Sequence, residues 1–91
     1  MKDLKDLRGK NCLLTGAASG IGRSLAFGLA REGMNLFLAD FDLDGLEAVA
    51  DNIRKSGTTV HTRKCDVSRL EDIENLAGEF YSEFDMLDLG G

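Results

Sequence analysis

The chain has 91 residues, of which 43% are hydrophobic and 30% are charged, and its formal net charge at pH 7 is −5. This length suits one small domain, and the hydrophobic fraction is ordinary for a globular protein. The negative charge disfavours nucleic acid and anionic membranes as partners, because both bind to basic surfaces. No apolar run approaches the ~20 residues that span a bilayer, and the N-terminal residues lack a signal-peptide core, so we expect a cytoplasmic protein.

Three short segments are predicted to be β-strands. Residues 11–15 and 35–40 are short apolar runs, which is typical of buried strands. Residues 59–65 have β-branched side chains but are more polar, which favours a strand at the edge of a sheet.

Helical spacing of apolar residues predicts helices over about 20–32, 43–56 and 69–83. A glycine follows each of the first two helices and is a plausible C-cap. The third helix is preceded by Ser68-Arg69-Leu70-Glu71, which has the form of a capping box.

The alternation of strands and helices predicts an α/β fold with a parallel sheet and right-handed crossovers. Two apolar strands and one polar strand favour the order 3-2-1. We therefore expect three layers, with residues 1–91 forming one mononucleotide-binding half of a doubly wound fold.

The stretch T-G-A-A-S-G-I-G at 15–22 falls where the first strand passes into the first helix. In this position, Gly16 can adopt a backbone geometry that a Cβ would strain. Gly20 allows close approach to a pyrophosphate, and Gly22 allows tight packing of helix on strand. The helix N-terminus offers N–H groups to the phosphates, and Ser19 could add a hydroxyl donor. A tight turn without any ligand is the simpler alternative.

A triphosphate-binding loop is a rival interpretation of the same region. Residues 17–24 nearly fit G-x-x-x-x-G-K-[ST], but Ala17 replaces the first glycine and Arg23 replaces the lysine. The lysine contacts the β- and γ-phosphates and is hard to replace, so this interpretation is disfavoured.

Asp40 ends the second strand, where an acidic side chain can accept hydrogen bonds from the ribose of adenosine. It would repel a 2′-phosphate, and neither Ser19 nor Phe41 supplies a basic group there, which favours NAD over NADP. Asp40 could instead be a solvated acid or a helix N-cap, although Asp42 and Asp44 are the more natural caps.

Asp66 follows the third strand in Cys65-Asp66-Val67. It would lie on the same sheet edge as Gly16 and Asp40, where its carboxylate can meet the amino group of adenine. A turn-forming role for Asp66 is the alternative.

The remaining chemically active residues carry no predicted site. Cys12 and Cys65 lie in predicted strands and are interpreted as reduced, mostly buried thiols, since a single pair makes neither a disulfide framework nor a metal site. His61 has no partner of catalytic type and is interpreted as structural or exposed.

Residues Thr15–Gly22 resemble the T-G-x-x-x-G-[IL]-G motif of the short-chain dehydrogenase/reductase family. Asp40 and the Cys-Asp-Val at 65–67 look like that family's adenosine-side residues. Residues 84–89 are similar to the segment that leads into its fourth strand. The resemblance extends from about Leu7 to Leu89 and implies the N-terminal half of a Rossmann domain.

The resemblance implies hydride transfer between NAD(H) and an alcohol or carbonyl substrate. The cofactor-binding residues that it implies are Gly16, Ser19, Gly20, Ile21, Gly22, Asp40, Phe41, Asp66 and Val67. No catalytic residue is assigned, because the family's Asn, Ser and Tyr-x-x-x-Lys group would lie beyond position 91. Tyr81 does not replace it, since Asp85 stands where the lysine would be needed.

We therefore expect residues 1–91 to be a truncated NAD-binding half-domain, inactive alone, whose parent enzyme binds a small-molecule substrate. A non-catalytic truncated or designed α/β scaffold or binding module is the alternative. In the family the first strand also pairs with a fourth strand. Without that partner, Cys12–Thr15 would present an apolar edge, through which we expect self-association.

Overall fold

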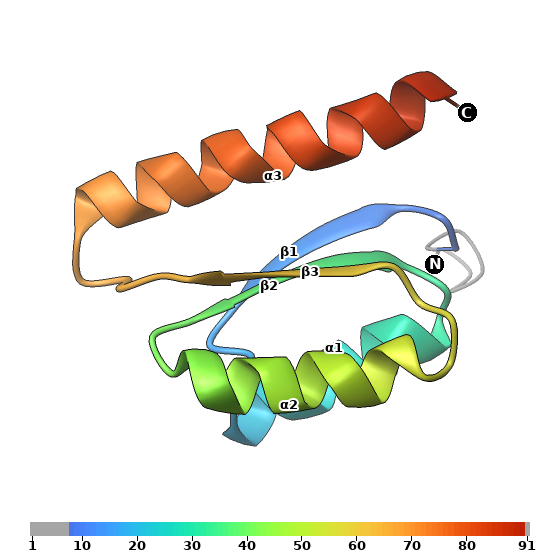
Figure 1. Cartoon of the computed structure of the whole chain (residues 1–91), viewed down its shortest axis with the longest axis horizontal. Coiled ribbons are helices and arrows are strands. Elements are labelled where there is room, and N and C mark those ends of the chain that lie inside the picture. The colour runs from blue at the N-terminus through green and yellow to red at the C-terminus, as the bar shows by residue number, and fades with distance from the viewer. Residues whose placement is uncertain (1–7, 91) are drawn as a thin grey trace, which may run out of the picture.

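The computed structural model describes the backbone of residues 8–90 and the side chains of residues 8–83. Strands and helices alternate along this part of the chain (Figure 1), which confirms the predicted α/β class. The strands are β1 (Asn11–Thr15), β2 (Asn35–Asp40) and β3 (Val60–Lys64), and the helices are α1 (Gly20–Arg31), α2 (Leu43–Arg54) and α3 (Leu70–Gly90).

The three strands form a parallel sheet with β2 in the middle, which confirms the predicted order 3-2-1. In this register, Leu13 of β1 lies opposite Phe37 of β2, and Phe37 lies opposite His61 of β3. The middle strand is the most apolar and the most buried, with Leu36 and Leu38 fully enclosed. The hydrophobic pattern predicted that β1 and β2 are both buried, whereas β1 is only partly buried because it pairs with β2 alone among residues 8–90.

The helices cover the two faces of the sheet unequally (Figure 1). Helices α1 and α2 lie on one face and α3 lies on the other. Because side chains alternate along a strand, Leu36 and Leu38 belong to the α1–α2 core, whereas Phe37 and Ala39 pack in a second core with Leu76 of α3. This is the predicted three-layer arrangement.

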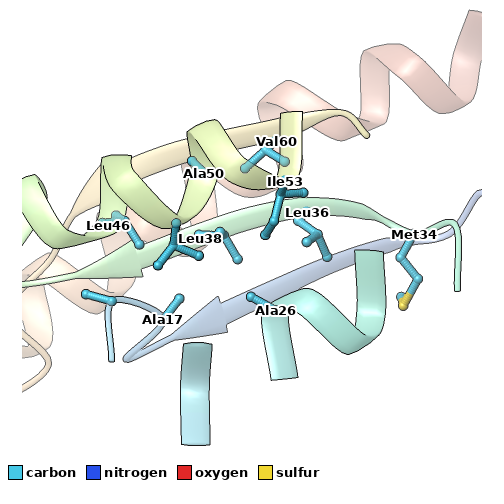
Figure 2. Packing of buried hydrophobic residues seen from close by; sticks show 11 residues of the cluster. Ala17, Ala26, Met34, Leu36, Leu38, Leu46, Ala50, Ile53 and Val60 are labelled. Carbon is cyan, nitrogen blue, oxygen red and sulfur yellow. The ribbon is translucent and has the colours of Figure 1, made fainter. Parts of the chain in front are cut away.

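The larger core lies between β2 and the helices α1 and α2. Figure 2 shows Leu46, Ala50 and Ile53 of α2 gathered beside Leu36 and Leu38 of β2. These α2 residues recur at spacings of three and four, so one face of the helix is buried on the sheet. This packing fixes where α2 begins, and therefore places the turn between β2 and α2.

The prediction for the end of the third helix is wrong. The sequence predicts that this helix ends at about residue 83, whereas α3 continues without a break to Gly90. A helix makes its backbone hydrogen bonds internally, so this extension needs no neighbouring strand. No helix in residues 8–90 combines the length and apolar character required of a membrane span.

The predicted strand at 59–65 is one residue shorter at each end. Both flanking residues nevertheless bond to β2, since Leu36 N donates to Thr59 O at 2.9 Å and Cys65 N donates to Asp40 O at 3.1 Å. The second bond joins the carboxyl ends of β2 and β3 directly. Helices α1 and α2 also end one and two residues earlier than predicted.

Candidate cofactor site

Three turns meet at one edge of the sheet, because parallel strands all end on the same side. They follow Thr15 of β1, Asp40 of β2 and Lys64 of β3. The register places Thr15 beside Ala39 and Asp40 beside Lys64, so the strands end nearly level. Every residue predicted for the site lies in or next to one of these turns.

The turn after β1 depends on glycine for two different reasons. Gly16 has a φ of 71° and Gly20 a φ of 60°, a region that residues with a Cβ rarely adopt. Gly22 has ordinary helical geometry, but a Cβ there would stand 1.9 Å from the carbonyl oxygen of Gly16. Helix α1 can therefore approach the turn closely only because position 22 has no side chain.

The N-terminus of α1 is left open by the chain itself. Ser19 is the N-cap residue, with an extended backbone at φ −156°, but its hydroxyl makes no capping hydrogen bond. The first turn of α1 contains no acidic residue. Since the first N–H groups of a helix have no internal acceptor and carry partial positive charge, this end can receive a phosphate.

Asp40 links the first two turns through both of its carboxylate oxygens. Oδ2 accepts a hydrogen bond from Ala18 N at 3.0 Å, and Oδ1 accepts one from Asp42 N at 2.9 Å. The alternative that Asp40 caps α2 is excluded, because the Asp42 side chain caps that helix by accepting from Gly45 N. Each oxygen of a carboxylate can accept a second bond, so Asp40 keeps capacity for ribose hydroxyls.

Asp66 forms part of its own turn, as the alternative interpretation required. Its Oδ1 accepts from Ser68 N at 3.0 Å and from Ser68 Oγ at 2.6 Å, and its own N–H donates to Asp72 Oδ2 at 3.1 Å. The described residues make no hydrogen bond to Asp66 Oδ2, which leaves that oxygen for a ligand donor. The bonds from Ser68 hold the pKa of Asp66 below its ordinary value, so the carboxylate stays ionised at neutral pH.

The predicted capping box at 68–71 is wrong, because Ser68 belongs to the turn that Asp66 forms. The Ser68 hydroxyl bonds to Asp66, and α3 begins only at Leu70. A serine that follows an aspartate by two residues can close a local turn, and here that turn competes with capping of the helix.

Apolar side chains surround these polar groups. Ile21 is 82% exposed, Phe41 63% and Val67 58%, and each stands in a different one of the three turns or at its helix start. Sequence reasoning missed Lys64, whose Nζ lies 4.9 Å from the centroid of the Phe41 ring. The signal that could have found it is the pairing of parallel strands, which sets the last residue of β3 beside the last residue of β2.

The other reactive side chains have packing roles. Burial raises the pKa of the Cys12 and Cys65 thiols, and the carboxylates of Asp72 and Asp66 raise that of Cys65 further. His61 stacks on the Phe37 ring. Within residues 8–83, no group of three or more His, Cys, Asp or Glu side chains is arranged to hold a metal ion.

Comparison with known proteins identifies the family of the chain. Residues 10–89 match the short chain dehydrogenase family, so the chain belongs to this family of oxidoreductases. The resemblance inferred from the glycine-rich turn is thereby confirmed.

Two curated relatives and one solved structure illustrate the match. An uncharacterised oxidoreductase of Schizosaccharomyces pombe is 40% identical over 72 residues, which are 79% of this chain and 28% of the relative. Epidermal retinol dehydrogenase 2 of Homo sapiens is 39% identical over 83 residues, which are 90% of this chain and 27% of the relative. The crystal structure of a short-chain dehydrogenase/reductase from Burkholderia phymatum in complex with NAD has a TM-score of 0.81 at 37% identity, over 84% of this chain and 27% of that chain.

Proposed function

We propose that this chain forms the adenosine and pyrophosphate side of the cofactor site in an NAD-dependent short-chain dehydrogenase. The parent enzyme would transfer hydride between NAD(H) and an alcohol or carbonyl compound, with the nicotinamide ring supplying the hydride chemistry. The observation that carries the proposal is the open N-terminus of α1, held beside Asp40 by the 3.0 Å bond from Ala18 N. Phosphates and ribose of one dinucleotide need these two groups side by side.

Each part of the nucleotide has its own partners in this proposal. The pyrophosphate binds over the turn of Gly16, Ser19 and Gly20 and at the first N–H groups of α1, where Ile21 and Gly22 lie. Asp40 accepts the ribose hydroxyls. Phe41, Val67 and the Asp66 carboxylate flank the adenine.

NAD is preferred to NADP because of how firmly Asp40 is held. Two backbone N–H groups fix its carboxylate, so the charge cannot turn away from an incoming 2′-phosphate. Neither Ser19 nor Phe41 supplies a cation to offset that repulsion.

The chain alone is proposed to have no turnover. It spans 28% and 27% of the two curated relatives above, and it contains no Tyr-x-x-x-Lys sequence. The substrate of the parent would bind to parts of the protein outside these 91 residues. A non-catalytic α/β scaffold or binding module is the second candidate, favoured only by that short span.

Self-association is proposed through β1, whose second edge has no strand beside it in residues 8–90. Leu13 and Leu14 lie in that strand, and Ile21 and Leu25 of α1 are exposed. The occupant would be β1 of a second copy, since unpaired strand edges bind each other. We also propose a cytoplasmic location. The net charge of −5 supports the proposal that the chain binds neither nucleic acid nor anionic membranes.

Titration of the 91-residue chain with NAD, ADP-ribose and NADP tests the cofactor proposal. We expect millimolar binding of NAD and ADP-ribose, weaker binding of NADP, and no NADH formation with a panel of alcohols. Absence of binding at millimolar ligand would favour the scaffold, and robust turnover would contradict catalytic incompleteness. Light scattering at rising concentration tests the β1 contact, which strictly monomeric behaviour would exclude.

A further inference from the structure

Phe41 and Lys64 form a pair at the carboxyl edge of the sheet. Phe41 directly follows Asp40, and Lys64 is the last residue of β3. The Lys64 Nζ stands 4.9 Å from the centroid of the Phe41 ring, within the range of a cation–π contact. Two features of the backbone bring them together, namely the pairing of Asp40 with Lys64 and the hydrogen bond from Cys65 N to Asp40 O.

The Lys64 ammonium has no carboxylate partner in the described part of the chain. Its neighbour Arg63 pairs with Glu79 of α3, and the ion pairs made by Arg54 use Glu47 and Asp51. The contact of Lys64 with an aromatic ring is therefore not a by-product of a salt bridge. At 4.9 Å the cation and the negative face of the ring attract each other.

The Phe41 ring is covered only in part. It is 63% exposed even with Lys64 against it, so much of the ring surface opens to solvent at the turn. An exposed phenylalanine without a partner would sample several rotamers and would lose that freedom on binding a ligand. Contact with the Lys64 ammonium favours the one Phe41 rotamer that the structure shows.

We infer that Lys64 is a positioning residue, which holds Phe41 so that the open part of its ring stacks on the adenine base. The inference rests on the proposed function, since it needs an adenine nucleotide at this edge. Adenine has a planar π-face, and bases stack favourably on aromatic side chains. The Asp66 carboxylate stands at the neighbouring strand end, joined to Asp40 through Cys65, where it can meet the exocyclic amino group.

A double-mutant cycle tests the role of Lys64, with ADP as the probe and NMR titration of the 91-residue chain as the measurement. Lys64→Met keeps most of the aliphatic stem and removes the charge, and is expected to weaken ADP binding by about two- to fivefold. Lys64→Arg keeps a cation over the ring and should bind ADP as the unaltered chain does. In a Phe41→Leu background, Lys64→Met should have no further effect, because the ring that it holds is gone.

Inorganic pyrophosphate separates positioning from simple charge attraction. Lys64→Met should leave pyrophosphate binding unchanged if Lys64 acts through Phe41. Loss of pyrophosphate affinity, or a loss of ADP affinity that persists in the Phe41→Leu background, would overturn the inference and make Lys64 a phosphate-attracting residue.

A ligand-free measurement tests the contact itself. The ε-methylene protons of Lys64 should resonate upfield because of the Phe41 ring current, and Phe41→Leu should abolish that shift. Failure of the unaltered chain to bind ADP would overturn the proposed function together with this inference. ADP binding that Lys64→Met leaves unchanged would overturn the inference alone.

Discussion

Helices α1 and α2 start from the same edge of the sheet and lie in the same layer, yet only α2 has a side-chain cap at its N-terminus. Asp42 caps α2 through a 3.1 Å bond from Gly45 N, and Asp44 adds a second carboxylate to its first turn. Helix α1 has Ser19 at the same position with no capping bond, and its first turn has no acidic residue. Side chains of the chain thus neutralise the positive end of α2, whereas the first turn of α1 has no such carboxylate.

Both helices also carry a glycine in the first turn, for different reasons. At Gly22 a Cβ would stand 1.9 Å from the backbone oxygen of Gly16, which cannot move without distorting the turn. At Gly45 a Cβ would stand 2.5 Å from Asp42 Oδ2, the end of a side chain that can rotate away. Gly22 is thus required by the backbone of the glycine-rich turn, whereas Gly45 leaves room for the side chain that caps α2.

The N-terminus of helix α3 resembles that of α2, because both have carboxylates in the first turn. Its first turn contains Glu71 and Asp72, and Asp72 accepts a bond from Asp66 N. Among the three helices of residues 8–90, only α1 begins without a carboxylate at its N-terminus. This difference supports the proposal that the pyrophosphate binds at α1 rather than at α2 or α3.

The largest expected effect is that of Gly22→Ala. The overlap with the Gly16 carbonyl should destabilise the fold by about 3 kcal/mol, the upper range for an added methyl group in a packed site. Urea unfolding measures it. Gly28→Ala is the matched control in the same helix, because its Cβ would meet nothing within 4 Å, and it should stabilise by roughly 1 kcal/mol through helix propensity. Equal stability of Gly22→Ala and the unaltered chain would refute the close-approach argument.

Asp40→Ala should have the next largest effect. It leaves Ala18 N and Asp42 N without their acceptor, which we expect to cost about 2 kcal/mol of unfolding free energy. The Ala18 amide should then exchange its hydrogen faster, as hydrogen-exchange NMR would report, and NAD affinity should fall. Protection of the Ala18 amide in the variant would show that Asp40 does not organise the glycine-rich turn.

Asp42→Ala tests the N-terminal cap of α2. Removing the α2 cap should cost about 1 kcal/mol of stability, the usual value for an N-cap residue. Because the cap serves α2 alone, the affinity for NAD should stay the same when both proteins are fully folded. A loss of NAD affinity as large as that of Asp40→Ala would mean that the two N-termini are not separate in function.

The smallest effect concerns the turn before α3. Ser68→Ala removes the hydroxyl bond that lowers the pKa of Asp66, so that pKa should rise toward its ordinary value, as carbon NMR of the carboxyl group can measure. A carboxyl with a lowered pKa stabilises the fold above its unfolded-state pKa, and this contribution disappears as the pH falls through the lowered value. The stability difference between Ser68→Ala and the unaltered chain should therefore shrink in acid. Ser68→Thr keeps the hydroxyl, so Asp66 should keep its lowered pKa in that variant. An unchanged Asp66 pKa in Ser68→Ala would contradict the role of the Ser68 hydroxyl.

Apolar runs and glycine positions were sufficient to predict the order of elements along the chain and the location of the glycine-rich turn, because both follow from local patterns. The exclusion of Asp40 as a cap was partly predictable, since Asp42 and Asp44 are better placed. The extension of α3 beyond residue 83 was not predicted. The same holds for the capping box at 68–71, where two local hydrogen-bonding patterns compete for one hydroxyl.

The sequence by itself determined the order of the elements, the glycines that the first turn requires and the acid at the end of the second strand. Each of these is a property of a short segment, decided by side-chain periodicity or by backbone freedom. Only the tertiary structure decided that Asp40 bonds to Ala18 and that Lys64 lies over Phe41. Those contacts join residues about twenty positions apart, and they exist because parallel pairing brings the ends of three strands to one edge.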